Sequence, residues 1–222
     1  MGEASHFVFM SANIKAQNHF YDGWIYRIFV DPSLGGIRRR IAKIVPDGSR
    51  VIDVGCGTGD QLLFIADKIS KGVCIELSET MVKTGKQQAS SKGISNCDFQ
   101  LADATDLSHL DDQSFDFAMC SMVIHEMPLD KRLPVLNEMK RLGKQIILVD
   151  WIHPHASIWK KLGTNSIEFM AGWEHYSGYR SFIKHGGMPE LIAEAGLDIV
   201  ETQITGKGTI QLWLCHPGAS IS

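Results

Sequence analysis

Several features that would place a protein in a membrane or on a secretory route are missing from this sequence. No apolar run approaches the roughly 18 residues that a membrane-spanning helix requires. The first residues contain no basic segment followed by an apolar one, so they do not resemble a signal peptide. Internal repeats, low-complexity tracts and long Pro/Gly/Ser linkers are also absent. We therefore expect a single cytoplasmic domain with no membrane span.

An excess of basic charge is missing as well. Lys and Arg total 22 against 25 Asp and Glu, so the formal net charge is -3. Proteins that bind a polyanion normally carry a basic surface. We expect no nucleic-acid partner, although Arg38, Arg39 and Arg40 could contact a phosphate locally.

The five cysteines provide neither a disulfide framework nor a metal motif. Their number is odd and no two form a C-x-x-C pair, so we expect reduced thiols packed in apolar surroundings. An alternative metal site could combine Asp150, His153 and His155 with His125 and His175. This D-x-x-H-x-H spacing matches no familiar metal signature, and we expect no metal.

The sequence does contain a regular alternation of short apolar runs with helical patterns. Residues 51–54, 73–75, 97–101, 115–122 and 145–149 are predicted strands, and helical spacing occurs over 62–69 and 129–139. Ser78 and Asp130 are placed to cap two helices, and Pro134 should lie near the first turn of the second. Near-continuous apolar strands are typical of a parallel sheet that is covered on both faces. We predict an α/β, Rossmann-like three-layer sandwich.

The C-terminal end departs from this alternation. Pro189 is suited to the first position of a short helix, and Gly196 is suited to end it. Residues 197–204 and 209–215 form two further predicted strands, joined by a short connection that contains Gly206, Lys207 and Gly208. Because so short a connection cannot make a parallel crossover, we predict a seven-stranded, mostly parallel sheet whose last strand is antiparallel.

The sharpest motif is the sequence Gly55-x-Gly57-x-Gly59, which follows the first predicted strand. Glycines at a strand-to-helix turn let a ligand approach the main chain and the amides at the helix start. The dinucleotide fingerprint would need a third glycine at position 60, which is Asp60, and no Lys-Ser/Thr pair follows to form a P-loop. Asp53 precedes the loop and suits a positively charged amino group better than a pyrophosphate.

Two further acidic residues follow the second and third predicted strands. Glu76 lies 21 residues beyond Gly55, where a carboxylate can accept hydrogen bonds from both hydroxyls of a ribose. Asp103 can accept from the exocyclic amine of an adenine while the Ala104 amide faces a ring nitrogen. Together with Asp53, one acid follows each of the first three strands.

On these residues the chain resembles the class I S-adenosylmethionine (SAM)-dependent methyltransferases, and most of all the ubiquinone/menaquinone-biosynthesis type. The likeness covers about residues 45–150: residues 51–59 resemble the first motif of the family and residues 115–121 its fourth-strand motif. It implies SAM as cofactor and S-adenosylhomocysteine as product. The cofactor-binding residues that it implies are Asp53, Gly55, Cys56, Gly57, Gly59, Glu76, Leu77, Asp103, Ala104 and Ser121.

The chain also departs from the family pattern. The family's fifth strand usually follows a Leu-Lys-Pro-Gly-Gly turn, whereas residues 141–145 read Arg-Leu-Gly-Lys-Gln. No Asn-Pro-Pro-Tyr motif follows the fourth strand, which argues against methylation of an adenine or glutamine amino group. Over residues 1–222 we expect one domain in four parts: an N-terminal helical lid (1–45), a SAM-binding half (46–150), a substrate-side insertion (151–186), and a final helix with two strands (187–222).

Methyl transfer needs an in-line attack on the methyl group, so alignment supplies much of the acceleration. His125 follows the fourth strand and is the candidate general base; alternatively it caps or orients its loop. Tyr21 could cover the SAM site or offer its ring face to the sulfonium, or belong to the apolar face of an N-terminal helix.

Aromatic residues are concentrated in the first and third parts of the chain, which favours a small, partly apolar acceptor that is quinol-like or lipid-like. The alternatives are a non-catalytic SAM-binding protein and a nicotinamide-dependent oxidoreductase. The sequence leaves the methylated atom and the oligomeric state open.

Overall fold

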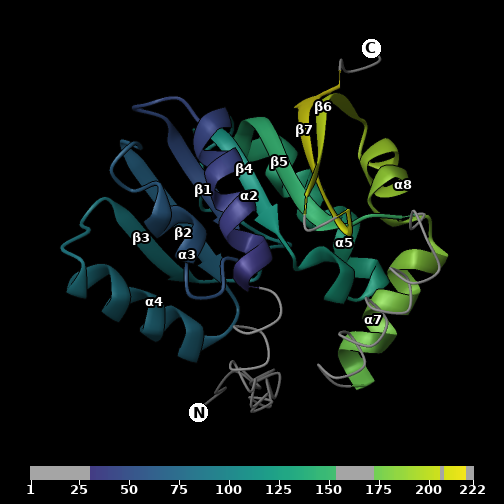
Figure 1. Cartoon of the computed structure of the whole chain (residues 1–222), viewed down its shortest axis with the longest axis horizontal. Helices are drawn as coiled ribbons and strands as arrows, with labels where there is room; N and C mark the ends of the chain where they lie inside the picture. Colours follow the sequence, from purple (N-terminus) through teal and green to yellow (C-terminus); the bar gives the residue numbers. More distant parts are fainter. Residues whose placement is uncertain (1–30, 154–172, 206–207, 219–222) are drawn as a thin grey trace, which may run out of the picture.

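A computed structural model describes residues 31–153, 173–205 and 208–218 (Figure 1). Its helices and strands, in chain order, are α2 (Asp31–Ile44), β1 (Arg50–Val54), α3 (Asp60–Phe64), β2 (Lys71–Glu76), α4 (Glu79–Ser91), β3 (Cys97–Leu101), β4 (Phe115–Ser121), the 3₁₀ helix η1 (Ile124–Glu126), α5 (Leu129–Leu142), β5 (Gly143–Trp151), α7 (Trp173–Lys184), α8 (Gly187–Glu194), β6 (Leu197–Thr205) and β7 (Ile210–Pro217).

The seven strands form one sheet in the order β3-β2-β1-β4-β5-β7-β6. Strands β1 to β5 pair in parallel, whereas β7 is antiparallel to both of its neighbours, β5 and β6. This confirms the predicted sheet and its antiparallel last strand. The strand order reverses between β1 and β4, which is where open α/β sheets bind ligands, beyond the carboxyl ends of the strands.

Helices cover both faces of the sheet (Figure 1). On one face α2, α3 and α4 pack over a core that includes Ile37, Ile41 and Leu62. On the other face α5, α7 and α8 enclose a second core that includes Leu136 and Trp213. In β1, Val51 belongs to the first core, whereas Ile52 and Val54 belong to the second. This is the two-sided burial expected of a near-continuous apolar strand. The three-layer prediction is therefore confirmed.

Helix ends are where the predictions need correction. Ser78 caps α4 as predicted, since its side chain accepts from the Met81 amide. Asp130 is not a cap: α5 begins at Leu129 after Pro128, and Asp130 lies in the first turn, where its charge still complements the helix dipole. Pro134 is the sixth residue of α5, further inside the helix than predicted; the helix continues past it and forgoes one backbone hydrogen bond.

Two other helices also differ from the sequence-based expectation. Pro189 is the third residue of α8 because Gly186, with φ +85°, precedes the helix; no partner is lost, since the first four amides of a helix have none within it. Helix α3 ends at Phe64 rather than near residue 69, and tight turns replace its predicted second half. Gly196, with φ +63°, follows α8 as predicted.

Helix α2 belongs to the N-terminal segment for which we expected a lid. Its Ile37 and Ile41 are buried on a face of the sheet, so a lid would have to come from residues 1–30, which lie outside the described residues. Within the described ranges, no helix is both long and apolar enough to cross a membrane.

Candidate functional site

The glycine loop lies between the carboxyl end of β1 and the start of α3. Gly55, Gly57 and Gly59 all have positive φ, at 68°, 57° and 75°, which side-chain-bearing residues adopt at a cost. Gly59 is also restricted by packing: a Cβ there would lie 2.5 Å from the Phe99 ring. The third glycine thus lets the loop pack closely on β3.

Gly57 differs from Gly55 and Gly59 in what lies around it. Within the described residues, a Cβ at Gly57 would meet only Met81 Sδ, at 3.7 Å. The protein's own packing therefore does not require glycine at this position, and space remains in front of the loop. A ligand that contacts the main chain would fit this space.

Glu76 connects the loop to the next helix. Its Oε2 accepts from the Gly57 amide at 2.9 Å, while its Oε1 accepts from the Leu77 and Ser78 amides, each at 2.9 Å. The carboxylate ends β2 beside the loop, as the ribose prediction requires, and it also holds the loop in shape. Leu77, the next residue, is 69% exposed, so its apolar side chain is available to a ligand.

Asp53 lies in β1, two residues before the loop, and is only 2% exposed. Burial, together with the negative charge of Glu76, raises the pKa of the Asp53 carboxyl to about 8. Both effects disfavour a second negative charge at this place. A ligand with a positively charged amino group would reverse the effect and favour the ionised carboxylate.

Asp103 and Ala104 begin the loop that connects β3 to β4. Asp103 Oδ1 accepts from the Thr105 amide at 2.9 Å and from the Thr105 hydroxyl at 2.7 Å. These bonds, helped by Lys131 at 3.5 Å, hold the pKa of Asp103 below its usual value. The carboxylate is therefore a charged acceptor whose orientation is fixed by its own turn.

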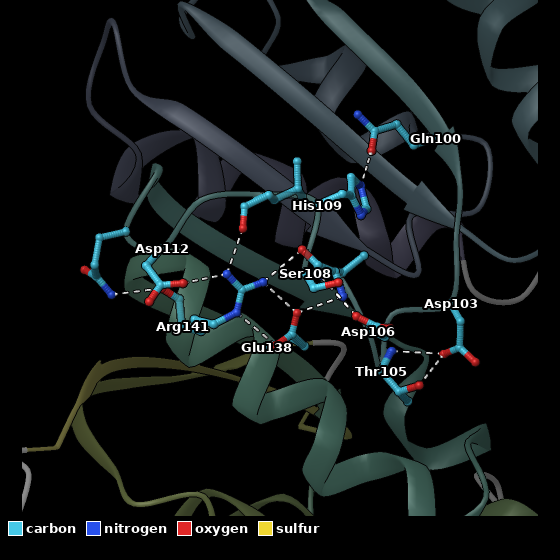
Figure 2. A network of polar contacts seen from close by, with 12 residues as sticks. Gln100, Asp103, Thr105, Asp106, Ser108, His109, Asp112, Glu138 and Arg141 are labelled. Atoms are coloured by element: carbon cyan, nitrogen blue, oxygen red, sulfur yellow. Dashed lines mark hydrogen bonds and ion pairs between the residues drawn. The ribbon is translucent and has the colours of Figure 1, made fainter.

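A network of polar contacts attaches the same loop to α5 (Figure 2). The Arg141 guanidinium donates to the Leu107 and Leu110 carbonyls and to the Asp112 and Glu138 carboxylates. Glu138 in turn accepts from the Leu107 amide at 2.8 Å. Arg141 stands where the family usually has a Leu-Lys-Pro-Gly-Gly turn; here α5 passes directly into β5.

His125, in η1 after β4, and Asp150, near the end of the neighbouring strand β5, form a buried pair. His125 Nδ1 lies 2.6 Å from Asp150 Oδ1. The same carboxylate accepts from the backbone amides of His125, at 3.2 Å, and Trp151, at 2.7 Å. Both side chains are at most 2% exposed. At this distance the carboxylate can accept a hydrogen bond from Nδ1–H.

Aromatic rings and a buried arginine surround this pair. The rings of Trp151, Tyr179 and Phe182 are edge-on to the imidazole, with centroids 6.2 to 6.4 Å away. Arg132 donates to the Met127 carbonyl and to the Gly178 carbonyl. These bonds attach α7 to the turn after β4 that contains His125.

Helix α7 contacts the His125 turn very closely at Gly178. A Cβ there would lie 2.7 Å from the Glu126 carbonyl oxygen and 3.1 Å from that of His125. Glycine is therefore needed where α7 crosses the turn.

The turn after β4 is adjacent to the glycine loop. Val123 Cγ1 would lie 2.8 Å from a Cβ built on Gly55. Met122 has φ +59°, which is uncommon for a residue with a side chain and is typical of functional turns. Ser121, which ends β4, has a buried hydroxyl that no described residue hydrogen-bonds. A buried hydroxyl of this kind normally has a partner, which a ligand could supply.

The structure thus brings most of the predicted residues to one edge of the sheet. Asp53, the glycine loop with Cys56, Glu76, Leu77, Asp103, Ala104, Ser121 and His125 all lie in or just beyond the carboxyl ends of β1 to β4. Tyr21 lies outside the described residues. All five cysteines are free thiols, and no three His, Cys, Asp or Glu side chains in the described parts are arranged to hold a metal ion. His155 of the alternative metal site is not among the described residues.

Sequence reasoning did not pair Asp150 with His125 and did not single out Arg132. The sequence did contain a signal for the pairing of Asp150 with His125. His125 follows the fourth predicted strand and Asp150 the fifth, and the carboxyl ends of neighbouring parallel strands meet at one edge of a sheet.

Comparison with known proteins agrees with the motifs. Residues 51–145 match the family described as methyltransferase domain. A demethylmenaquinone methyltransferase of Listeria monocytogenes serotype 4a is 26% identical over 175 residues, which cover 70% of this chain and 73% of the relative.

Solved structures show the same fold. A SAM-dependent methyltransferase from Aquifex aeolicus superposes with a TM-score of 0.59 at 18% identity, over 89% of this chain and 94% of that one. A geranyl diphosphate methyltransferase in complex with GPP and sinefungin has a TM-score of 0.59 at 13% identity, over 82% of this chain and 77% of that one.

The motifs, the fold and these matches together support a class I SAM-dependent methyltransferase with SAM as its cofactor. Among such enzymes it is similar to the demethylmenaquinone methyltransferases. The chemistry of the site fits this cofactor. Among the described residues, space is open in front of Gly57 and the buried Ser121 hydroxyl has no hydrogen-bond partner. A cation beside Asp53 would favour the ionised form of this buried carboxyl.

Proposed function

We propose that this enzyme transfers the methyl group of SAM to a small, partly apolar molecule such as a quinol. In this proposal Asp53 faces the amino group of SAM, and residues 55–59 contact SAM through their main chain. Glu76 faces the ribose, and residues 103–104 face the adenine. Leu77 packs against the nucleoside and Ser121 lies near the methionine end. Bound SAM supplies a methyl group already activated by the positive sulfonium.

One observation carries the proposal: the turn with His125 contacts the glycine loop through Val123 and Gly55. A buried polar group that can take a proton is therefore held next to the cofactor loop. The Trp151, Tyr179 and Phe182 rings border it, and aromatic walls with a few polar groups suit a small ligand. The similarity to demethylmenaquinone methyltransferases supports a quinol-like acceptor in particular.

Labelled SAM tests this proposal directly. The purified protein would be incubated with methyl-labelled SAM and, in parallel, with a prenylated naphthoquinol that lacks the ring methyl group, simple phenols, tRNA and a basic protein. We expect label in the organic extract of the naphthoquinol or phenol reactions. Label in RNA or protein alone would contradict a small-molecule acceptor.

Binding measurements separate this proposal from the two alternatives. Calorimetry should show stoichiometric binding of S-adenosylhomocysteine and none of NAD, which an oxidoreductase would bind. Tight binding of S-adenosylhomocysteine with no transfer to any acceptor would favour a non-catalytic SAM-binding protein.

The predicted lid and Tyr21 remain a proposal from the sequence. Deleting residues 1–30 should abolish most turnover and leave the circular dichroism of the sheet unchanged, because the aromatic residues of that segment are proposed to close over the acceptor. Replacing Tyr21 by Phe in the full chain separates the role of its hydroxyl from that of its ring. Full activity of the truncated protein would contradict the lid.

A further inference from the structure

We propose that two copies of this chain pair through β6, antiparallel and around a twofold axis at Thr202, so that one sheet continues through both copies. The inference goes beyond the proposed function and does not depend on it. It assigns an interaction surface to the end of the sheet that lies farthest from β3, and the partner that fits this surface is a second copy of the chain.

Strand β6 forms one end of the sheet, where within the described ranges it pairs with β7 alone (Figure 1). Its other edge is therefore available to a further strand. Three of its apolar side chains are also exposed: Ile199 by 48%, Val200 by 55% and Ile204 by 55%. An edge strand with exposed apolar side chains promotes pairing with another chain, because pairing satisfies its backbone groups and buries those side chains together.

The face of β6 on the side of α5, α7 and α8 is self-complementary in an antiparallel pair. Thr202 is opposite Trp213, which belongs to the core on that side. Because side chains alternate along a strand, Val200 and Ile204 share this face with Thr202. With Thr202 on the axis, Val200 of each copy is opposite Ile204 of the other. Apolar side chains that are directly opposite in this way stabilise a pair of strands.

The other face of β6 carries opposite charges in the same register. Gln203 is opposite Leu212, which belongs to the core covered by α2, and Glu201 shares the face of Gln203. Arg40 of α2 donates to the Gln203 side-chain oxygen at 2.8 Å, so its guanidinium reaches the last strand of the sheet. Around the proposed axis, Glu201 of each copy is opposite Gln203 of the other. It thereby faces the Arg40 that this Gln203 holds, and the twofold axis repeats the contact.

A bulge limits the length of the paired segment. The register between β6 and β7 shifts between Ile199 and Glu201, and a bulge bends a strand and increases its twist. We therefore confine the pairing to residues 200–204, about the length of an ordinary strand. Because this interface is small, we expect a dimer that dissociates on dilution.

Sedimentation velocity of the purified full chain over a series of concentrations tests the pairing. We expect a reversible equilibrium between monomer and dimer for the wild type. Glu201→Lys and Arg40→Glu each bring like charges together across the axis, and each should raise the dissociation constant of the dimer by about 10- to 100-fold. The double variant Arg40→Glu/Glu201→Lys reverses both charges and should restore the wild-type constant.

The apolar face is tested in the same way. The double variant Val200→Lys/Ile204→Lys places lysines opposite one another and should leave only monomer. Phe64→Lys is the matched control, because Phe64 is 49% exposed and lies in α3, away from β6. It should leave the dissociation constant unchanged.

Thr202→Cys tests the register. Two cysteines opposite each other on the axis have a Cα separation that a disulfide can span, so mild oxidation should link two copies covalently. Thr80→Cys introduces an exposed thiol in the first turn of α4 and should give no more linked product than the wild type does.

Two results would overturn the proposal. One is a wild-type protein that stays monomeric at every concentration at which it is soluble. The other is a dimer that none of the β6 variants weakens, which would place the contact on another surface. Circular dichroism checks that each variant folds. A failure of the proposed function is distinguishable, because association is measured without SAM and without an acceptor.

Discussion

Val123 packs directly over Gly55: a Cβ on this glycine would lie 2.8 Å from Val123 Cγ1 and 3.2 Å from Cγ2. Gly55 belongs to the glycine loop that is proposed to bind SAM, and Val123 lies two residues before His125. The contact fixes the spacing between this proposed SAM site and the part that contains the proposed base. In-line transfer depends on such spacing, since a displacement of about 1 Å can cost about 10²-fold in rate. The two halves of the site are therefore one packed unit.

Gly57→Val is expected to abolish binding of S-adenosylhomocysteine while the protein still folds. In the part of the chain that the structure describes, the one atom near a Cβ at this position is Met81 Sδ at 3.7 Å, so the new side chain occupies the space proposed for the ligand. The φ of +57° adds about 1–2 kcal/mol of backbone strain. Calorimetry measures the binding, and thermal denaturation measures the strain.

Gly48→Val is the matched control for that strain. Gly48 has φ +79° and nothing within 4 Å of its Cβ position, and it precedes β1 at the opposite end of that strand. It should lose a similar amount of stability and keep its affinity for S-adenosylhomocysteine. Tight binding by a folded Gly57→Val protein would show that the ligand does not approach this glycine.

Glu76→Ala should weaken the binding of S-adenosylhomocysteine by about 1.5–3 kcal/mol, the loss expected for hydrogen bonds to a charged acceptor. This loss corresponds to a roughly 10- to 150-fold increase in Kd. The carboxylate also accepts from the Gly57 amide, so part of the loss comes from a looser loop. Glu79→Ala, three residues further on at the surface of α4, should leave Kd unchanged. An equal Kd for both variants would show that Glu76 does not contact the ribose.

Asp53 should make both stability and binding depend on pH. Its pKa is raised from 3.8 to about 8 in the folded protein. Between these two pH values Asp53 is therefore protonated in the folded state and ionised in the unfolded state. The stability of the ligand-free protein should therefore fall as pH rises from about 4 to about 8. Asp53→Asn should flatten this fall, as measured by denaturation at several pH values.

Binding of SAM should release the same proton. The amino group of the ligand favours ionised Asp53, so near pH 7 the measured binding enthalpy should vary with the ionisation enthalpy of the buffer. In Asp53→Asn this variation should disappear. An identical buffer dependence in the two proteins would place the amino group elsewhere.

The sequence was most informative where one strand's own pattern decided the outcome. Residues 97–101 alternate apolar and polar side chains and form β3 at those bounds. The short connection that contains Gly206 and Gly208 dictated the antiparallel last strand. Helix ends were less certain because capping by Ser78 or Asp130 depends on where the preceding chain turns.

The site was harder to predict than the fold, because it depends on contacts between distant residues. His125 and Asp150 are 25 residues apart and meet only because β4 and β5 are neighbours. On the sequence alone, Asp150 fitted a metal cluster as readily as a partner for His125. Arg132 was indistinguishable from an ordinary basic residue of a surface helix, since only tertiary packing buries it.

Arg141→Gln should lower both the stability of the protein and its affinity for SAM. The guanidinium holds two carbonyls and two carboxylates of the β3–β4 loop and α5, and that loop begins with the proposed adenine contacts Asp103 and Ala104. Hydrogen bonds to charged groups contribute about 1.5–3 kcal/mol, so we expect a loss of unfolding free energy of this size. Lys144→Gln removes the more exposed pair with Asp116, which is worth about 1 kcal/mol or less, and should not change affinity. If Arg141→Gln loses stability but keeps the Kd of S-adenosylhomocysteine, the network supports the fold and not the adenine site.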